Sequence, residues 1–394
     1  MKLRSCILSF SAALVLSGTA ATAQEIANTR MAPLKSPEVS ATSVTFRLRA
    51  PQAQSVSLSG ALAAMDPGKG AMKKDADGVW SLSIPMPEGE LYTYNFMVDG
   101  VSMLDGQNVA VIRDGSRYMN ALLIPEGVGS LYQECPEPGN LEQMWYYSKE
   151  NDMTRRLYVY TPYGYDRNNG YKKYPVLYLL HGGGGDEDAW ATLGKTCQIL
   201  DNLIMQKKAT PMIVVMPNGN PNQYAAQTLQ RPVKENVKTY ASGFDNYSSL
   251  TSDIVPFIEK TYNVIKDKSG RSVAGLSMGG GQSFYIAFRN VDMFSSVGIY
   301  SSGLIGSSAI GGAAFNAEEH FPGMLTNPDL FNHFDVIYLS SGEQDNRIDG
   351  MKAFYETLKA KGYKGVVWEQ YPGAHEWKVW RRNLASYVQM IFKK

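Results

Sequence analysis

The feature that most constrains this chain is a change in the spacing of its apolar residues near residue 139. Before that point, apolar and polar residues alternate in short runs, as in Val44–Leu48, Val79–Ile84 and Tyr92–Val98. A period of two predicts strands that are buried on one face, and turns containing glycine and aspartate separate them. We therefore expect residues 24–125 to form an antiparallel β-sandwich of immunoglobulin-like type.

After residue 139, short runs that are apolar throughout alternate with stretches of helical length. Such runs occur at Val176–Leu180, Ile213–Met216 and Val273–Leu276. Strands buried on both faces and joined by helices predict a mainly parallel sheet with helices on both sides. We expect this α/β domain to span residues 140–394, and a linker rich in Pro and Gly to occupy residues 126–139.

The N-terminus has the pattern of an export signal. Lys2 and Arg4 precede the apolar run Ile7–Leu16, and Ala21-Thr22-Ala23 fits the small-x-small cleavage rule. The apolar run is too short to cross a bilayer, and no later segment reaches the length of about 18 apolar residues that a spanning helix needs. We expect residues 1–23 to be a removed signal peptide, no membrane span, and export to the periplasm or the extracellular space.

Composition excludes several classes of protein. Apolar residues make up 44% of the 394 residues, which is enough to bury two cores and excludes a disordered chain. Lys and Arg number 38 against 37 Asp and Glu, so the chain carries no charge excess that would attract nucleic acid. Two cysteines remain after the signal peptide, Cys135 and Cys197, and they either form one disulfide or stay as thiols.

The segment Gly275-Leu276-Ser277-Met278-Gly279 joins an apolar run to a helical stretch. A G-x-S-x-G sequence between a strand and a helix is the nucleophile elbow of the α/β-hydrolase fold. The glycines leave room for a sharp turn, and the start of the helix favours developing negative charge. The alternative is a serine that only caps the helix, but the strand-turn-helix context predicts that Ser277 is a nucleophile.

A serine nucleophile needs a base that takes its proton, and histidine is the usual one. The sequence has four histidines, at positions 181, 320, 333 and 375. His375 lies in a loop before the last helical stretch, where the α/β-hydrolase fold places its base. His181 precedes a run of glycines and is expected to order that loop. His320 and His333 lie in polar stretches and are expected at the surface.

The third catalytic group must be a carboxylate between the serine and the histidine in the chain, because this fold runs in the order Ser, acid, His. The loop after the apolar run Val336–Leu339 offers Glu343, Asp345 and Asp349. We predict Asp345 from its place in that loop, with Glu343 as the alternative. Its charge would hold the histidine in the required tautomer and stabilise the imidazolium.

The oxyanion of a tetrahedral intermediate needs hydrogen-bond donors. The N–H of Met278, directly after the serine, is one candidate, and the N–H of Gly183 in the run Gly182–Gly185 is the other. Four glycines can also cradle a phosphate, but neither the Gly-Lys-Ser/Thr motif nor a dinucleotide-binding fingerprint is present. Since no His, Cys or carboxylate cluster shows ligand spacing, we expect no metal site. Ester hydrolysis by a serine nucleophile requires no cofactor, and we expect none.

Three segments together resemble carbohydrate esterase family 1, in particular the feruloyl esterase domains of bacterial xylanases. The segments are Tyr174–Trp190, Pro211–Gly219 and Ala274–Phe284. By this resemblance, Ser277, Asp345 and His375 take the triad positions, and Gly183 and Met278 are the oxyanion donors. The N-terminal sandwich resembles early-set modules, in particular those of carbohydrate-binding module family 48.

The resemblance implies a serine esterase that hydrolyses feruloyl esters on arabinoxylan through an acyl-enzyme, with feruloylated or acetylated xylan fragments as its partners. An acetylxylan esterase of the same family is one alternative. A carbohydrate-binding protein that keeps the hydrolase scaffold without catalysis is another. The esterase interpretation is favoured because the triad and oxyanion candidates are all present.

Aromatic and polar residues near these motifs are candidates for substrate binding. Trp190 and Trp377 could stack on a phenolic ring or a sugar, or could only pack loops onto the core. Gln282, just after the nucleophile motif, is a further candidate, as is the long polar segment 218–246. Trp80 lies in an alternating strand, which favours a place in the sandwich core over a sugar-binding platform.

Overall fold

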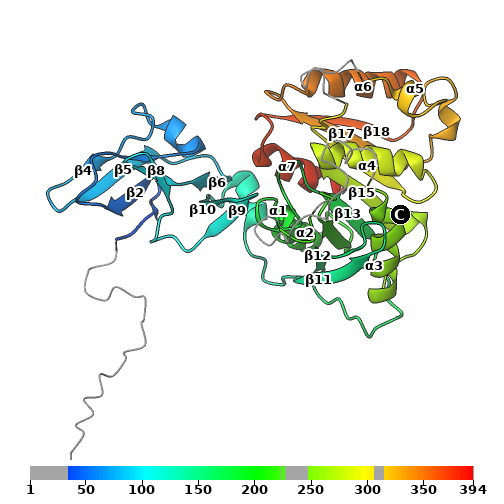
Figure 1. The fold of residues 1–394 in the computed structure, drawn as a ribbon, viewed down its shortest axis with the longest axis horizontal. Helices are drawn as coiled ribbons and strands as arrows, with labels where there is room; N and C mark the ends of the chain where they lie inside the picture. The colour runs from blue at the N-terminus through cyan, green and yellow to red at the C-terminus, as the bar shows by residue number, and fades with distance from the viewer. Residues whose placement is uncertain (1–33, 222, 227–246, 306–314, 394) are drawn as a thin grey trace, which may run out of the picture.

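The computed structural model describes residues 34–221, 223–226, 247–305 and 315–393. The predicted signal peptide and residues 227–246 of the polar segment lie outside these ranges. The described chain forms two domains that lie next to each other (Figure 1). Within the described ranges, no helix combines the length and the apolar character that crossing a bilayer requires.

The N-terminal domain consists of three small antiparallel sheets with the strand orders β1-β2-β5-β4, β3-β7-β8 and β6-β10-β9. Its strands are β1 (Glu38–Val39), β2 (Ser43–Arg49), β3 (Val56–Leu58), β4 (Lys73–Lys74), β5 (Val79–Pro85), β6 (Leu91–Tyr94), β7 (Phe96–Val98), β8 (Val101–Met103), β9 (Val111–Asp114) and β10 (Arg117–Leu123). Their alternating apolar residues form one core. Trp80 is buried there and its indole N–H donates to the Ala50 carbonyl at 2.9 Å, which confirms the core interpretation.

The C-terminal domain is built on one eight-stranded sheet with the order β11-β12-β14-β13-β15-β16-β17-β18. The strands are β11 (Asn140–Ser148), β12 (Met153–Thr161), β13 (Val176–Leu180), β14 (Ile213–Pro217), β15 (Arg271–Leu276), β16 (Ser296–Tyr300), β17 (Val336–Gly342) and β18 (Val366–Tyr371). Strands β11 and β12 pair antiparallel, as do β12 and β14, whereas every later pair is parallel. The carboxyl ends of the parallel strands therefore meet at one edge, where such sheets place their ligands.

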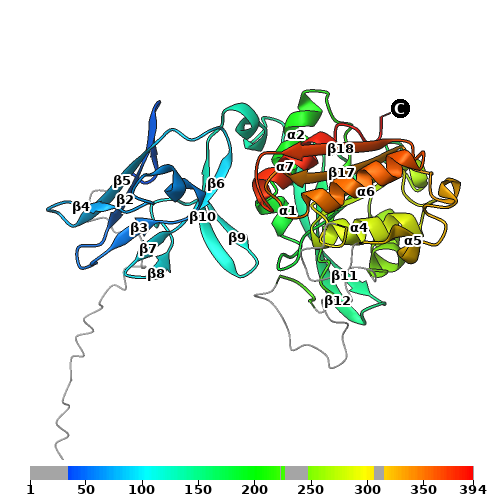
Figure 2. The ribbon, with the colours of Figure 1, turned by 90° about the horizontal axis from the view of Figure 1, so that it is seen from above.

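Helices cover both faces of this sheet (Figure 2). They are α1 (Ala189–Thr192), α2 (Thr196–Met205), α3 (Val255–Thr261), α4 (Met278–Arg289), α5 (Ala317–His320), α6 (Ile348–Ala360) and α7 (Trp377–Tyr387). One face packs on α3, α4 and α6, and the other on α1, α2 and α7. Successive residues of β13 belong to the two cores in turn, because neighbouring side chains of a strand point to opposite faces. The predicted α/β architecture after a β-sandwich is confirmed.

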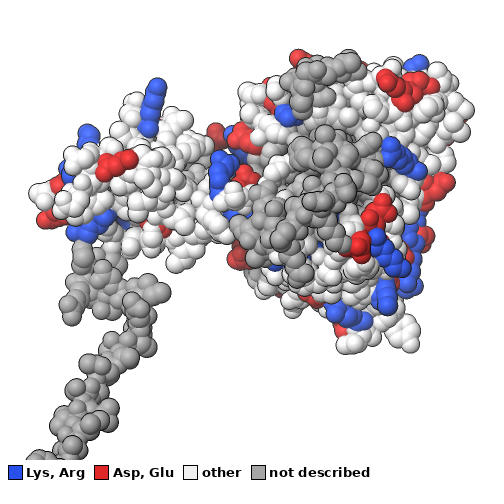
Figure 3. Space-filling model, in the orientation of Figure 1, with Lys and Arg blue, Asp and Glu red and all other residues white. Residues whose placement is uncertain are grey.

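The two domains share a buried interface. Leu91, Ile112 and Tyr132 from the sandwich side belong to the same apolar core as α1, α2 and α7. At the junction, Arg381 of α7 donates to Glu90 at 2.9 Å, and both side chains are almost fully buried. Figure 3 shows acidic and basic side chains gathered where the domains meet. A contact that combines an apolar core with buried ion pairs fixes the two domains to each other.

The segment predicted as a linker also packs against the C-terminal domain. Residues 127–132 form a short 3₁₀ helix, and the Asn202 side chain of α2 donates to the carbonyls of Leu131 and Gln133.

In the same region, Cys135 and Cys197 are both free thiols. Burial raises the pKa of the Cys197 thiol to about 12, so that thiol stays protonated at neutral pH.

Candidate active site

Ser277 lies at a sharp turn between β15 and α4. Its backbone has φ 51° and ψ −110°, a conformation that costs on the order of 1–3 kcal/mol in a residue other than glycine. The turn requires close backbone approach: a Cβ on Gly279 would lie 2.5 Å from the Leu180 carbonyl oxygen and 2.6 Å from that of His181. The geometry is that of a nucleophile elbow, which presents the serine side chain above the sheet.

Backbone hydrogen bonds hold this turn in place. The Ser277 N–H donates to the Tyr300 carbonyl at the end of β16 at 2.8 Å. The Ser277 carbonyl accepts from the N–H groups of Gly281 and Gly303, each at 3.2 Å. Met278 is the first residue of α4, so its N–H is one of the helix-terminal donors that have no partner within the helix. The elbow is therefore fixed by main-chain groups of the sheet and the helix.

His375 and Asp345 form a pair at the same sheet edge. Asp345 follows the end of β17, is buried, and its Oδ2 lies 2.8 Å from Nδ1 of His375. Burial raises the pKa of the Asp345 carboxyl, but hydrogen bonds from His375 and from the Arg347 N–H outweigh it and leave the pKa below its ordinary value. The carboxylate is thus ionised and fixes the imidazole orientation. The competing candidates Glu343 and Asp349 are exposed, and the structure pairs neither with His375.

Ser277 and His375 line one cavity of about 620 Å³. Its wall includes Gly182 and Gly183 of the glycine run and Trp377 and Trp380 of α7. The sandwich supplies the opposite wall, with Gly60, Ala61, Glu90, Leu91, Tyr92, Thr93, Asp114, Arg117 and Met119. The cavity therefore lies between the two domains and takes residues from both.

The loop after β13, residues 181–188, contains the glycine run, and we name it the oxyanion loop after the role predicted for Gly183. His181 at its start is buried; Nδ1 lies 2.7 Å from the Gly182 carbonyl and Nε2 accepts from the Gly219 N–H at 2.9 Å. An acceptor at Nε2 means that the proton is on Nδ1, which donates to Gly182. Burial lowers the pKa of His181, so the ring is neutral and orders the loop, as the sequence predicted.

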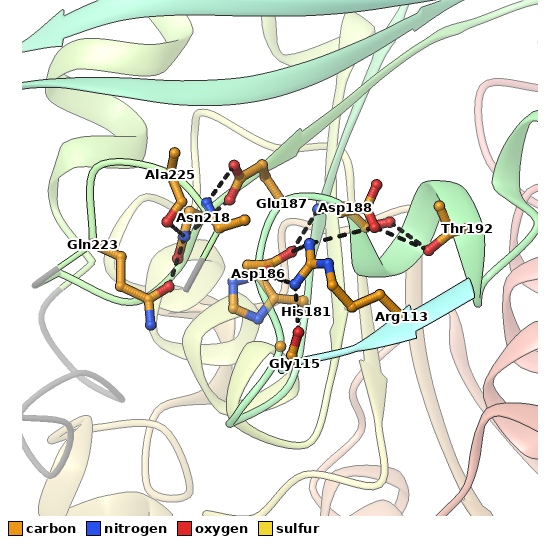
Figure 4. A network of polar contacts seen from close by, with 12 residues as sticks. Arg113, Gly115, His181, Asp186, Glu187, Asp188, Thr192, Asn218, Gln223 and Ala225 are labelled. Atoms are coloured by element: carbon orange, nitrogen blue, oxygen red, sulfur yellow. Dashed lines mark hydrogen bonds and ion pairs between the residues drawn. The ribbon is translucent and has the colours of Figure 1, made fainter. Parts of the chain in front are cut away.

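The far end of the oxyanion loop is held by charged side chains (Figure 4). Glu187 is buried and accepts from Arg156 Nε at 2.7 Å, from the Asn218 side chain at 3.0 Å and from the Ala226 N–H at 2.9 Å. Asp186 accepts two hydrogen bonds from Arg113 of the sandwich. None of these partners is near the loop in sequence, so no local motif indicates these contacts.

The predicted substrate-binding residues occupy different places. Trp377 lines the cavity. Trp190 is only 1% exposed and its indole N–H donates to the Leu180 carbonyl at 2.9 Å; it is a core residue, which corrects the prediction that it stacks on substrate. Gln282 is likewise buried, and its side-chain amide donates to the Gly219 carbonyl at 3.1 Å, so it supports a loop and does not face the cavity.

Trp380 was missed by the sequence analysis. It lines the cavity, and its ring is perpendicular to that of His375 with the centroids 4.9 Å apart. The signal was its spacing of three residues from Trp377, which places both on one face of α7.

Comparison with known proteins identifies the family. The Esterase family model matches residues 148–391, and the model of carbohydrate-binding module 48 (isoamylase N-terminal domain) matches residues 34–112. The chain belongs to the esterase family. It carries an N-terminal domain of the module 48 type. Within the described part of this esterase, no group of three or more His, Cys, Asp or Glu side chains is placed to hold a metal ion.

Individual relatives agree with this assignment. The esterase is 30% identical over 354 residues to an endo-1,4-beta-xylanase/feruloyl esterase of Xylanibacter ruminicola, a match that covers 88% of this chain and 44% of that protein. It is similar to a carbohydrate esterase family 1 ferulic acid esterase of Anaeromyces mucronatus solved with ferulic acid, with 26% identity, a TM-score of 0.52, and coverage of 66% of this chain and 93% of that one.

A third match extends over both domains. The enterobactin esterase of Shigella flexneri is 16% identical, with a TM-score of 0.64 and coverage of 89% of this chain and 94% of that one. At this identity the likeness shows the fold alone. The chain spans less than half the length of the xylanase/feruloyl esterase that it matches.

Proposed function

We propose that this esterase hydrolyses feruloyl and related hydroxycinnamoyl esters of plant cell-wall polysaccharide, with arabinoxylan as the substrate. The observation that carries the chemistry is the pair of Asp345 and His375 on the same cavity edge as the strained Ser277. The acyl group is inferred from the relatives, two of which are described as feruloyl or ferulic acid esterases.

Acylation begins when Ser277 Oγ attacks the ester carbonyl carbon and His375 Nε2 takes the hydroxyl proton. Asp345 stays ionised, keeps the proton of the neutral ring on Nδ1 and stabilises the imidazolium that forms. The carbonyl oxygen becomes an oxyanion and accepts from the N–H groups of Met278 and Gly183. When the intermediate collapses, the C–O bond to the sugar breaks and His375 returns the proton to the sugar oxygen.

Deacylation repeats these steps with water. His375 takes a proton from the water molecule, the resulting hydroxide attacks the feruloyl carbonyl, and the same two N–H groups accept the negative charge. Collapse breaks the bond to Ser277 Oγ, which receives the proton from His375. The products are the free hydroxycinnamic acid and the polysaccharide hydroxyl, and no cofactor enters either step.

The cavity favours an aromatic acyl group over acetyl. Its volume of about 620 Å³ lies within the range of about 300–1,000 Å³ that holds ligands larger than an acetyl group. Trp377, Trp380, Leu91 and Met119 supply apolar walls against which a phenolic ring can pack. An acetylxylan esterase would leave most of this surface unused.

Hydrolysis of methyl ferulate by the purified chain, compared with acetyl release from acetylated xylan, tests the proposal. We expect release of ferulate at a kcat/KM at least tenfold higher than for acetyl release. Ser277→Ala lowers kcat by about 10⁶-fold, by analogy with nucleophile removal in subtilisin. Asp345→Asn lowers kcat by about 10⁴-fold because it favours the wrong histidine tautomer.

Glu343→Gln is the matched control, because Glu343 is an exposed carboxylate two residues from Asp345, and its kcat should stay within twofold of the wild-type value. Faster turnover of acetylated xylan would favour the acetylxylan esterase. Absence of turnover on every ester, together with binding of xylan, would favour a carbohydrate-binding protein and overturn the proposal.

We also propose that the chain is exported after removal of residues 1–23, in agreement with a polysaccharide substrate that lies outside the cell. The support is the charged and apolar pattern of the N-terminus and its small-x-small site. N-terminal sequencing of the chain recovered from the producing cells tests this. A mature start near Gln24 is expected, and an intact N-terminus in the cytoplasm would contradict it.

A further inference from the structure

Arg113 of the sandwich crosses the domain boundary to the oxyanion loop. It lies on β9, and its Nη1 and Nη2 donate to the two carboxylate oxygens of Asp186 at 2.5 and 2.9 Å (Figure 4). Nη1 also donates to the Gly115 carbonyl, and Nη2 lies 3.4 Å from Asp188. The side chain of Arg113 is 10% exposed and that of Asp186 2% exposed.

The Arg113–Asp186 pair fixes the position of the Asp186 carboxylate and also neutralises its charge. Two parallel N–H···O bonds from a planar guanidinium to a carboxylate define both distance and direction, which a single ammonium group does not. The hydrogen bonds with Asp186 raise the pKa of Arg113 above its already high ordinary value, so the guanidinium is always charged. The third hydrogen bond, to Gly115, holds the arginine against its own hairpin.

Asp186 passes this restraint to the glycine run. Its carboxylate accepts from the Asp188 N–H at 3.0 Å, and its carbonyl accepts from the N–H of Ala189, where α1 begins. The preceding residue, Gly185, donates from its N–H to the Gly182 carbonyl at 3.2 Å and closes a tight turn. Gly183 lies inside that turn, so the direction of its N–H depends on where both ends of the turn are held.

We propose that Arg113 is a positioning residue for ester hydrolysis: by holding Asp186 it fixes the turn that presents the Gly183 N–H to the oxyanion. The inference rests on the proposed function, because it assumes the oxyanion role of Gly183. It makes the sandwich part of the catalytic unit, even for esters too small to fill the cavity. A displaced donor reduces the stabilisation of the transition state and leaves binding of the substrate in its ground state almost unchanged.

The rival explanation is that Arg113 only docks the two domains. A second ion pair across the same boundary separates the two ideas, because Arg382 of α7 lies 3.4 Å from Glu90 and its side chain is also largely buried. Arg382 has no contact with residues 181–188 among the described interactions. If docking alone matters, neutralising Arg382 should also lower activity, although Glu90 keeps its hydrogen bond with Arg381.

The experiment measures kcat and KM for methyl ferulate with wild type, Arg113→Gln, Arg113→Lys and Arg382→Gln. We expect Arg113→Gln to lower kcat by about 10- to 100-fold, less than the loss of a whole oxyanion donor, with KM within about threefold. Arg113→Lys keeps the charge but cannot make the two parallel hydrogen bonds of the guanidinium, and its kcat should fall by about fivefold to tenfold. Arg382→Gln should stay within about threefold.

Chemical rescue and a double variant complete the test. Millimolar guanidinium, far below denaturing concentrations, should raise the kcat of Arg113→Ala at least threefold and leave wild type unchanged. Asp186→Asn combined with Arg113→Gln should lose no more than the worse single variant, because the two groups act as a unit. Urea unfolding of each variant shows whether it folds. If Arg113→Gln does not fold, the kcat of Arg113→Lys tests the inference.

Three outcomes would overturn the inference: wild-type kcat in Arg113→Gln, an equal loss in Arg382→Gln, or a change in KM alone. These outcomes are distinct from failure of the proposed function. If the wild-type chain hydrolyses no ester, the proposed function fails, and Arg113 then has no reaction in which to act.

Discussion

The nucleophile elbow and the oxyanion loop lie next to each other, yet they are held in different ways. The elbow is fixed by backbone: Gly279 allows α4 to approach β13 closely, and the Ser277 N–H bonds to the end of β16. The oxyanion loop is fixed by side chains that come from other parts of the chain. Arg113 and Arg156 each hold a carboxylate of this loop, one from each domain.

The difference predicts which parts of the candidate active site tolerate substitution. A Cβ added at Gly279 would lie only 2.5 Å from a backbone carbonyl oxygen, so only glycine fits at this position of the elbow. A loop held by hydrogen bonds can keep part of its geometry when one partner is replaced by a group of similar shape. Substitutions at the elbow should therefore abolish function, and substitutions around the loop should lower it by degrees.

Among the substitutions that test this comparison, Gly279→Ala is expected to have the largest effect. Its Cβ would meet two backbone carbonyl oxygens that cannot move independently, so the turn must shift and take both Ser277 and the Met278 N–H with it. We expect kcat/KM for methyl ferulate to fall by about 10³-fold and the free energy of unfolding to fall by about 1–3 kcal/mol. Steady-state kinetics and urea unfolding measure the two quantities.

The matched control is Gly280→Ala, where the nearest backbone oxygen lies 3.0 Å from the added Cβ. Its activity should fall by less than about tenfold. An active Gly279→Ala variant with wild-type stability would show that the elbow is not fixed by close backbone approach.

Glu187→Gln tests the hydrolase side of the oxyanion loop. Removing the charge leaves Arg156 buried without its carboxylate, and we expect a loss of about 3 kcal/mol in the free energy of unfolding. The amide keeps one acceptor oxygen, so kcat should fall by only about 10- to 50-fold. The same kinetic and urea measurements apply. A loss as large as that of Gly279→Ala would remove the contrast between the two regions.

Trp190 in the core and Trp377 in the cavity wall should separate stability from binding. Trp190→Phe removes the hydrogen bond to the Leu180 carbonyl and should cost about 1–3 kcal/mol in unfolding free energy, with KM unchanged. Trp377→Phe should instead raise KM for methyl ferulate about threefold to fivefold at nearly constant stability, because Trp377 lines the cavity. If Trp190→Phe instead raised KM and Trp377→Phe lowered only stability, Trp190 would be a substrate contact after all.

The smallest expected effect concerns pH. The folded pKa of His181 is lowered from 6.5 by burial, so below that pH the unfolded chain binds a proton that the folded chain does not. The free energy of unfolding therefore decreases as pH falls. Between pH 7 and 5.5 the free energy of unfolding of wild type should fall further than that of His181→Gln, by at most about 1 kcal/mol; the glutamine cannot titrate but can accept from Gly219. Urea unfolding at both pH values measures this, and equal losses would contradict it.

The sequence alone determined those features that are local. Alternating apolar residues define the sandwich, continuous apolar runs define the buried parallel strands, and both periods follow from where successive side chains point. The flanking glycines of Ser277 and the loop positions of Asp345 and His375 were readable because the α/β-hydrolase fold places these groups at strand ends. The structure brings Asp345 and His375 within 2.8 Å, and their catalytic roles stay a proposal.

Only the tertiary structure decided what surrounds those groups. No pattern indicates that Arg113 pairs with Asp186, 73 residues away, or that the sandwich forms one wall of the cavity. The same limit explains the wrong prediction for Trp190 and the missed Trp380, since both follow from which face of a helix meets the sheet. Local sequence sets backbone geometry, whereas contacts between distant side chains depend on how the finished domains pack.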